Sequence, residues 1–307
     1  MRVALTGTTS GIGLRAAAAL CAAGHDVVAL VRDPRRARDL VRDDRLDVVR
    51  VDLAEPATIA DAAAAVAAAG PLDALVLNAA VFDQSLREPR VTSRGQELFW
   101  ATNHLGPFEL AARLSPALAA ASSPHLVFVA SKGVIAMPRI RIRFDELDDL
   151  TWFTPTRAYY HAKLAQVMTA MTLAESAGDR LAVSCLRVPA VRLDPARLAE
   201  QPPLLRLLYA PKNAAAATPE RLAAAYADLV AEPRRRSLDE VYVDETLRVV
   251  PPPAFARDPE ARRRLWAVSQ AATGSPRLNG TTMPGAPPGG LIAAAMSPSH
   301  PVRSLLR

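Results

Sequence analysis

The chain contains 307 residues, half of them hydrophobic, so it is long enough and apolar enough to form one large domain around a substantial core. Its formal charge of +6 comes from arginines scattered among acidic residues, a pattern that gives no support to nucleic-acid binding. No apolar run reaches the roughly 18 residues that span a bilayer, and MRVALTG leaves no room for a signal peptide. Because Cys21 and Cys185 lack metal-ligand spacing, we expect a reduced cytoplasmic protein that binds no metal.

Short β-branched apolar runs alternate with alanine-rich helical stretches through the first 130 residues. Strands are predicted at 3–7, 26–31, 46–52, 72–80 and 125–131, and helices at 12–23, 56–69 and about 95–119. Strands separated by helices of this length are typical of right-handed βαβ units, and continuously apolar strands suit a sheet that is buried on both sides. The pattern therefore predicts an α/β fold with a Rossmann-like, doubly wound parallel sheet in a three-layer α/β/α arrangement.

The second half of the chain continues this pattern and then loses it. A helix carrying AYYHAKLAQ, a strand at 181–188, a helix at 219–231 and a strand at 239–245 complete the predicted sheet. Between the strand at 181–188 and the helix at 219–231, an apolar segment at about 190–213 that is bounded by prolines indicates a lid, and the alternative is an ordinary packed helix. Residues 271–307 are rich in Gly, Pro and Ser without a period, so we expect a single domain over 1–270 and then a disordered tail.

The segment TGTTSGIG (6–13) follows the first predicted strand and opens the first predicted helix. Glycine lets the backbone turn tightly and approach a pyrophosphate, whose charge then meets the free N–H groups of the helix N-terminus. In this strand–turn–helix context the motif predicts a dinucleotide site. The residues expected to bind the cofactor here are Gly7, Thr9, Ser10, Gly11, Ile12 and Gly13.

The ends of the following strands indicate which dinucleotide binds. Val31 stands at the last apolar position of the second strand, where a carboxylate would hold an adenosine 2′-hydroxyl, and Arg32 follows it. A guanidinium there pairs bidentately with a 2′-phosphate, which favours NADP(H) over NAD(H). The alternative is a solvated arginine at a helix start, next to Asp33. Asp52 is placed to accept a hydrogen bond from the adenine amino group, and Asn78 to border the ribose.

Tyr159 and Lys163 are four residues apart in the predicted helix of AYYHAKLAQ, in a chain with only three lysines. Residues at this spacing share a helix face, with Cβ atoms roughly 5 to 6 Å apart. An ammonium group that close favours phenolate and lowers the tyrosine pKa, which makes tyrosine a usable acid or base near neutral pH. An isolated pair of this kind usually belongs to an ordinary surface helix, so the other motifs decide between the two interpretations.

Together these motifs resemble the short-chain dehydrogenase/reductase family over roughly residues 1–250. The G-x-x-x-G-x-G loop at 7–13, Asp52-Leu53, Asn78-Ala79-Ala80, Asn103 in TNHLG, Ser131 in FVAS and Tyr159-x-x-x-Lys163 stand in the family's order and spacing. The similarity is greatest to the branch that holds retinol dehydrogenases and light-dependent protochlorophyllide reductases, through segments such as PLDALVLNAAVF (71–82) and RRLWAVSQ (263–270).

The resemblance implies catalytic roles for four residues. Tyr159 would be the general acid that protonates the substrate oxygen, and Ser131 would hydrogen-bond the same oxygen. Lys163 would lower the pKa of Tyr159 and bind the nicotinamide ribose, while Asn103 would hold a water that links Lys163 to solvent. The remaining residues that the resemblance adds to the cofactor site are Leu53, Ala79, Pro189 and Val191.

The chain also departs from the family pattern. The family usually has Pro-Gly after the sixth strand and then a threonine that touches the nicotinamide carboxamide, whereas this chain has Pro189-Ala190 and continues to Asp194 without a threonine. Val191 replaces the cysteine that follows Pro-Gly in protochlorophyllide reductases, and their long insertion before the catalytic tyrosine is absent. Nicotinamide placement is therefore predicted less firmly than phosphate binding, and reduction of protochlorophyllide itself is not expected.

Three functions stay open on the sequence alone. The first is an NADPH-dependent oxidoreductase acting on a carbonyl or alcohol of a fairly large apolar molecule. The second is a C=C reductase of a conjugated or tetrapyrrole-like substrate, and the third is a non-catalytic NADP-binding sensor or scaffold. We expect a small-molecule substrate, no nucleic acid and no integral membrane segment. Relatives associate through the helices bearing Asn103 and Tyr159, but the closest branch is often monomeric, so a homo-oligomer is possible but unsupported.

Overall fold

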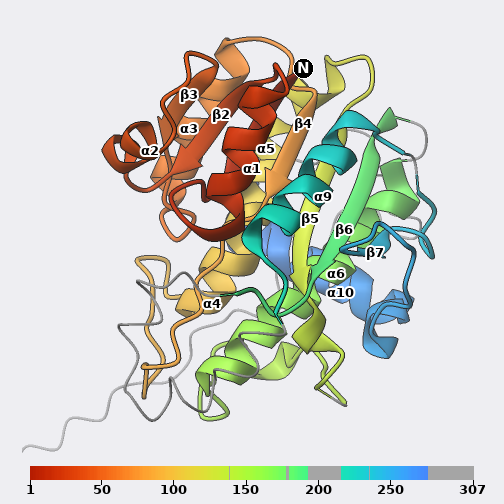
Figure 1. Cartoon of the computed structure of the whole chain (residues 1–307). Helices are drawn as coiled ribbons and strands as arrows, with labels where there is room; N and C mark the ends of the chain where they lie inside the picture. The colour runs from red at the N-terminus through yellow and green to blue at the C-terminus, as the bar shows by residue number, and fades with distance from the viewer. Residues whose placement is uncertain (138, 178–179, 193–215, 235, 276–307) are drawn as a thin grey trace, which may run out of the picture.

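The computed structural model describes residues 1–137, 139–177, 180–192, 216–234 and 236–275. Within them, one seven-stranded sheet pairs its neighbouring strands in parallel, in the order β3-β2-β1-β4-β5-β6-β7 (Figure 1). The strands are β1 (Arg2–Thr6), β2 (Asp26–Val31), β3 (Leu46–Arg50), β4 (Ala74–Leu77), β5 (His125–Ser131), β6 (Ala182–Val188) and β7 (Tyr242–Asp244).

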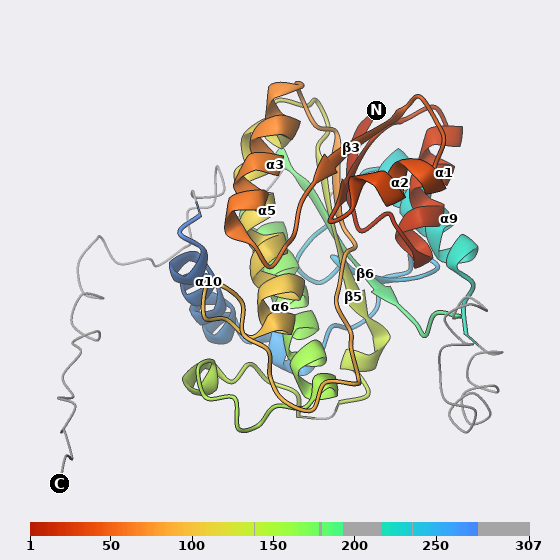
Figure 2. The ribbon, with the colours of Figure 1, turned by 90° about the vertical axis from the view of Figure 1, so that its left-hand side faces the viewer.

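Helices cover both faces of this sheet, as Figure 2 shows. Successive side chains of a strand point to opposite faces, and on β5 Phe128 enters the core on one side while Val127 and Val129 enter the core on the other. The helices are α1 (Gly11–Ala22), α2 (Pro34–Leu40) and α9 (Pro219–Ala231) on one face, and α3 (Pro56–Ala68), α5 (Gly106–Ala119) and α6 (Pro155–Ala177) on the other, with α10 (Pro259–Thr273) outside α6. The expected three-layer α/β/α fold is confirmed.

The strand order reverses between β1 and β4. The chain runs outward from β1 to β2 and β3, and then returns to place β4 on the other side of β1. In sheets of this kind, ligands bind at the carboxyl ends of the strands beside such a switch point. The glycine loop follows β1 and Asn78 follows β4, so the topology brings these two predicted motifs together.

Most predicted elements are confirmed with shifts of a few residues at their ends. The helix predicted at about 95–119 is confirmed over residues 98–119, where α4 (Leu98–Trp100), a π-helical turn (Ala101–Leu105) and α5 follow one another without a break. Gly106, where α5 begins, packs against the loop after β3, and a Cβ atom there would lie 2.2 Å from the Leu53 carbonyl oxygen. The strand predicted at 239–245 is also shorter, since β7 has three residues.

Two helices lie where no helix is predicted. The short α2 buries only Ala37, so it has almost no apolar periodicity to reveal it. The second, α10, ends at Thr273 and is followed by Gly274 in the left-handed conformation (φ +57°). Residues 271–273, expected to belong to the tail, are therefore helical, and the predicted domain boundary at residue 270 falls inside α10.

Parts of two other predictions lie outside the described residues. These are residues 193–215, which include most of the expected lid, and residues 276–307 of the expected tail. The described residues that flank the lid segment pair with each other, because Arg192 N donates to the Ala217 carbonyl at 2.9 Å and Ala217 N donates to the Ala190 carbonyl at 3.0 Å. Among the described helices, none is long and apolar enough to cross a membrane.

Candidate active site

A cavity of about 550 Å³ opens at the carboxyl ends of β1, β2 and β4. Its walls bring together thirteen of the residues predicted from the sequence: Gly7, Thr9, Ser10, Gly11, Ile12, Gly13, Arg32, Asp52, Leu53, Asn78, Ala79, Tyr159 and Val191. Four other predicted residues, Asn103, Ser131, Lys163 and Pro189, are not among its lining residues. The glycine loop and the candidate acid Tyr159 thus face one cavity.

The glycine loop is shaped for close backbone approach. Gly7 has a φ of +77°, and a Cβ atom at Gly13 would lie 2.2 Å from the Gly7 carbonyl oxygen and 2.5 Å from Nδ2 of Asn78. No other residue type fits at position 13 without moving the loop. The space that these two glycines leave beside the N-terminus of α1 suits a pyrophosphate group.

Asn78 is tied to this loop by its side chain. Its Nδ2 donates to the carbonyl oxygens of Thr6 at 2.9 Å and Gly7 at 3.3 Å, and its Oδ1 accepts a hydrogen bond from the Tyr226 hydroxyl at 2.9 Å. The position expected to border the ribose therefore also clamps the glycine loop. Tyr226 is fully buried on α9, and because it lies 148 residues away from Asn78, no local sequence signal pointed to it.

The adenosine end of the cavity carries two arginines. Arg32 and Arg36 both line it and are both exposed, and Arg36 was missed from the sequence because α2 was missed. Asp33 also lines the cavity, but its carboxylate accepts a hydrogen bond from Arg36 N at 3.1 Å as the N-cap of α2. The acidic neighbour of Arg32 is therefore engaged in starting a helix.

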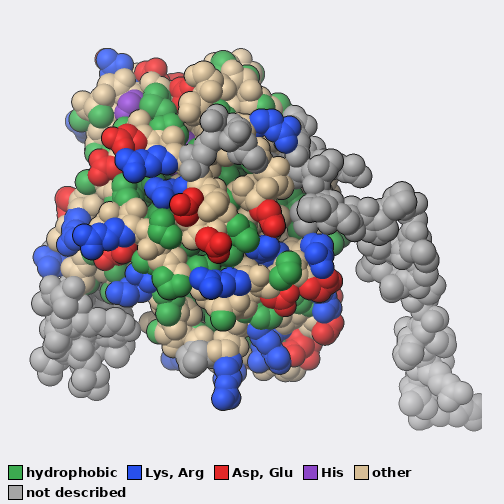
Figure 3. All heavy atoms as spheres, turned by 90° about the vertical axis from the view of Figure 1, so that its right-hand side faces the viewer, with side chains coloured by type: hydrophobic (Ala, Val, Ile, Leu, Met, Phe, Trp, Pro, Cys, Tyr) green, Lys and Arg blue, Asp and Glu red, His purple; other side chains and the backbone are tan. Residues whose placement is uncertain are grey.

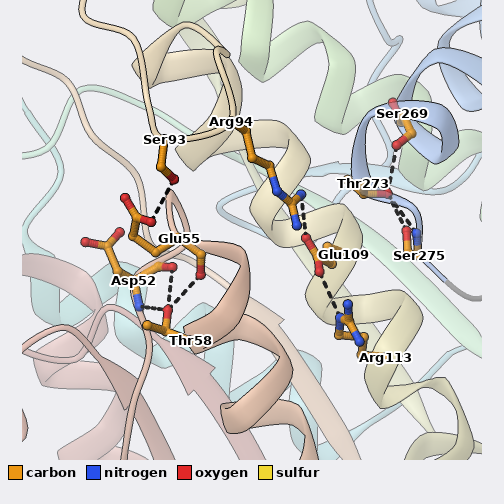
Figure 4. A network of polar contacts seen from close by, with 10 residues as sticks. All are labelled: Asp52, Glu55, Thr58, Ser93, Arg94, Glu109, Arg113, Ser269, Thr273 and Ser275. Carbon is orange, nitrogen blue, oxygen red and sulfur yellow. Dashed lines mark hydrogen bonds and ion pairs between the residues drawn. The ribbon is translucent and has the colours of Figure 1, made fainter.

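Asp52 is held in place by its own loop, as Figure 4 shows. Its backbone N–H donates to Oγ1 of Thr58 at 2.9 Å, and its Oδ1 accepts from Ala54 N at 3.0 Å. The same view shows Glu55 accepting a hydrogen bond from Ser93 Oγ at 2.8 Å. These contacts fix the loop after β3 beside the cavity without using the second carboxylate oxygen of Asp52.

Tyr159 lies half-buried in the cavity wall, near Ser131 at the end of β5. Burial raises the pKa of Tyr159 well above its ordinary value, Tyr160 raises it further, and a side-chain hydrogen bond with Ser131 opposes the shift. The expected lowering of this pKa by Lys163 is not found, because Lys163 Nζ lies 5.9 Å from the centroid of the Tyr159 ring and points elsewhere. The ring of Phe82 covers Tyr159, with 4.4 Å between their centroids.

Lys163 is almost completely enclosed, with 2% of its surface exposed. Its Nζ donates to the Val129 carbonyl at 2.7 Å and to Oε1 of Gln166 at 2.8 Å. Burial lowers the pKa of Lys163 to about 8, while Cys185 opposes this shift. Gln166, fully buried one helical turn from Lys163, is a second residue that sequence reasoning missed, although its polar side chain within an apolar helix face was a visible signal.

Asn103 lies in the π-helical turn between α4 and α5 and is fully buried. Both ends of its amide bind the backbone of Val81, with Oδ1 accepting from N at 2.7 Å and Nδ2 donating to O at 2.9 Å. Asn103 therefore ties the π-helical turn to the loop after β4 that carries Phe82. The described residues contain no cluster of three or more His, Cys, Asp or Glu side chains suited to a metal ion.

Residues 2–140 match the family model described as short chain dehydrogenase. Dehydrogenase/reductase SDR family member 13 of Homo sapiens is 32% identical over 290 residues, which cover 88% of this chain and 72% of that protein. The chain belongs to the short-chain dehydrogenase/reductase family. The protochlorophyllide reductase of Avena sativa is 37% identical over 138 residues, covering 42% of this chain and 44% of that protein. The predicted family and branch are confirmed.

Two further comparisons agree with this membership. A protein named probable oxidoreductase from Streptomyces antibioticus is 33% identical over 196 residues, covering 60% of this chain. The chain spans 62% of the length of that relative. Among solved structures, a short chain dehydrogenase from Salmonella enterica superposes with a TM-score of 0.59 at 22% identity, covering 80% of this chain and 95% of that one. That similarity shows the shared fold.

Proposed function

We propose that this protein is an NADP(H)-dependent oxidoreductase that acts on the carbonyl or alcohol of a fairly large apolar molecule, with Tyr159 as acid and base. The observation that carries the proposal is that Tyr159 and the glycine loop line one cavity. A bound nicotinamide cofactor would supply or accept the hydride. The chain's own residues would bind the dinucleotide, hold the substrate oxygen and move the proton.

The proposed cofactor preference rests on the shape and charge of the cavity. Gly7 and Gly13 leave room for the pyrophosphate, and Arg32 with Arg36 presents two guanidinium groups for an adenosine 2′-phosphate. Oδ1 of Asp33 caps α2, so one of its two carboxylate oxygens is already engaged by the backbone. These contacts support NADP(H) over NAD(H).

The cofactor preference is tested by titrating the protein with NADPH and NADH while following nicotinamide fluorescence. We expect NADPH to bind more tightly than NADH, and Arg32→Ala and Arg36→Ala to remove most of that difference. Arg35→Ala is the matched control, since Arg35 is an exposed arginine of the same helix that does not line the cavity. Equal affinity for both dinucleotides in the unmodified chain would contradict the NADP(H) preference.

Proton transfer is assigned to Tyr159. On this proposal its hydroxyl protonates the substrate oxygen that Ser131 also contacts. The family resemblance gives Lys163 the nicotinamide ribose and Asn103 a water that leads to solvent, and both roles would require these buried side chains to leave the partners that they bind in the structure. Tyr159→Phe should lower kcat by roughly 10²- to 10⁴-fold, the usual contribution of a positioned acid or base, and leave NADPH binding intact. Tyr160→Phe is the matched control. A Tyr159→Phe variant with normal kcat on a substrate found by screening would exclude this role.

Similarity to protochlorophyllide reductases supports a second candidate, reduction of a conjugated C=C bond. Val191 lines the cavity where those enzymes have a cysteine, so proton delivery to carbon would need another donor. Product analysis separates the candidates, because carbonyl reduction yields an alcohol and C=C reduction yields a saturated carbonyl compound. Tight NADPH binding without turnover of any substrate in a broad carbonyl and enone panel would instead favour the non-catalytic sensor.

A further inference from the structure

A second pocket, of about 950 Å³, lies apart from the dinucleotide cavity and shares no lining residue with it. Its walls come from the 3₁₀ turn Lys132–Val134 and the loop after it, from the end of β6, and from residues 251–255, which follow β7. Val134, Ile140 and Phe255 contribute apolar surface. The volume is within the range of pockets that bind small organic molecules.

Four arginines line this pocket, and the described lining residues include no acidic side chain. Only Arg143 has a carboxylate partner, Glu146, at 2.6 Å. Among the described residues, Arg139, Arg141 and Arg187 form no salt bridge. On the lower half of the face that Figure 3 presents, basic side chains lie among hydrophobic and acidic ones.

Arg187 is the innermost of these arginines, because it belongs to β6 and is half-buried. Its Nε atom is shielded from solvent and has no hydrogen-bond partner. Asp244, its strand neighbour on β7, lies close enough for the two opposite charges to interact, but no ion pair between them is found among the described residues. Oδ1 of Asp244 accepts instead from Thr246 N at 2.9 Å, Thr246 Oγ1 at 2.7 Å and Arg248 N at 3.2 Å. A buried charged donor without a partner is costly, and a bound anion would satisfy it.

We propose that this pocket binds an organic acid in which a carboxylate is attached to an extended apolar body, with the carboxylate on Arg187 and the apolar body against the Val134 and Phe255 walls. A planar guanidinium pairs with a carboxylate through two parallel charge-assisted hydrogen bonds. Arg139 and Arg141, which are exposed, add positive charge at the mouth and draw the anion in. The apolar walls select an amphipathic acid over a small inorganic anion.

The test is isothermal titration calorimetry of the full chain with sodium dodecanoate below its micelle concentration, with and without saturating NADPH. We expect saturable binding in both conditions, and no binding of dodecyltrimethylammonium, which has the same apolar chain and the opposite charge. Arg187→Met should weaken dodecanoate binding by about tenfold or more, as expected for loss of a charge-assisted contact. Arg187→Lys, which keeps the charge, should weaken it less.

The control is Arg50→Met, an exposed arginine on β3 at the opposite edge of the sheet, which should bind dodecanoate normally. If circular dichroism shows that Arg187→Met does not fold, the double variant Arg139→Met/Arg141→Met, at two exposed arginines, should also weaken binding.

Displacement of dodecanoate by NADPH would place dodecanoate in the dinucleotide cavity and overturn the proposal. Equal affinities in the arginine variants and the control would overturn it as well. Arg32→Ala, which is expected to weaken NADPH binding, should leave dodecanoate binding unchanged, so the two sites are tested separately.

Discussion

Lys163 is an ammonium group surrounded by protein rather than by water. Its two hydrogen-bond acceptors, the Val129 carbonyl and Gln166, carry no charge, so neither compensates fully for the loss of hydration. The resulting pKa of about 8 means that this one group loses its proton within the pH range of an ordinary enzyme assay. If the ammonium form is the active one, kcat/KM falls as the pH rises above about 8.

We predict that Gln166→Glu shifts the fall of kcat/KM at alkaline pH to a pH higher by ~1 unit or more, because a carboxylate beside Lys163 favours the ammonium form. Gln166→Leu removes a hydrogen-bond acceptor and should shift this alkaline fall to a lower pH. A profile of kcat/KM from about pH 6 to about pH 10 measures both shifts. Ser176→Ala, on the same helix, is the control. If kcat/KM falls at the same pH in both Gln166 variants as in the unmodified chain, Lys163 is not the titrating group.

Two buried tyrosines, Tyr226 and Tyr242, allow the effect of removing a bonded hydroxyl to be compared with that of removing an unbonded one. The Tyr226 hydroxyl donates to Asn78 and so supports the glycine loop, whereas the buried Tyr242 hydroxyl has no hydrogen-bond partner. Tyr226→Phe should reduce the free energy of unfolding by about 1 kcal/mol and weaken NADPH binding, since Asn78 loses a partner. Tyr242→Phe should be neutral or stabilising. Urea unfolding and NADPH titration measure the pair, and equal effects of the two changes would contradict the proposed clamp.

At the scale of elements, α10 provides a cover for α5, the π-helical turn and α6. Trp266 packs edge-on against Phe108 with centroids 5.1 Å apart, and Ser269 Oγ lies 2.8 Å from His104 Nε2. Arg262 reaches Glu175 at 3.0 Å. The helices that carry Asn103 and Tyr159 are therefore packed against α10.

We predict that Trp266→Ala reduces the free energy of unfolding by roughly 3 to 5 kcal/mol, the usual effect of emptying a buried aromatic site. Chemical denaturation measures this loss. Arg263→Ala, an exposed change on the same helix, should alter it by less than about 0.5 kcal/mol. Equal stabilities for the two variants would mean that α10 is not an integral layer of the fold. Size-exclusion chromatography of Trp266→Ala also shows whether loosening α10 leads to self-association.

For the whole molecule, three buried histidines link stability to pH. Burial lowers the pKa of His104 and His161 to about 3 and that of His125 to about 4, each from an ordinary value of 6.5. All three are therefore neutral in the folded protein at mildly acidic pH. The unfolded chain binds protons at these positions below about pH 6.5, so the folded state loses stability as the pH falls from there toward 4.

We predict a steep decrease in the free energy of unfolding between about pH 6.5 and about pH 4.5, with each histidine contributing up to ~1.4 kcal/mol per pH unit. Urea unfolding at intervals of about half a pH unit measures the slope. His25 shows no such burial, so His25→Asn should keep the slope of the unmodified chain. A free energy of unfolding that stays constant over this range would contradict the burial of these rings as neutral groups.

Much of the fold and of the dinucleotide site follows from local patterns. Continuously apolar β-branched runs specify buried strands, and the boundaries of β2, β5 and α9 agree with the prediction. The glycine spacing of 7, 11 and 13 marks the loop, because the required backbone freedom is a property of each residue itself. The spacing of Tyr159 and Lys163 likewise follows from helix geometry alone.

The amino-acid sequence by itself thus determined the parallel α/β architecture, the family, and thirteen of the residues that line the dinucleotide cavity. Only the tertiary structure decided which way Lys163 points, that Tyr226 supports Asn78, and that the helix at 98–119 contains a π-helical turn just before Gly106 meets Leu53. It also decided that α10 covers α6 and that four arginines from two separate segments meet in a second pocket. The physical reason is that strands, turns and helix faces depend on neighbouring residues, whereas these contacts join residues distant in the chain and exist only after the sheet has assembled.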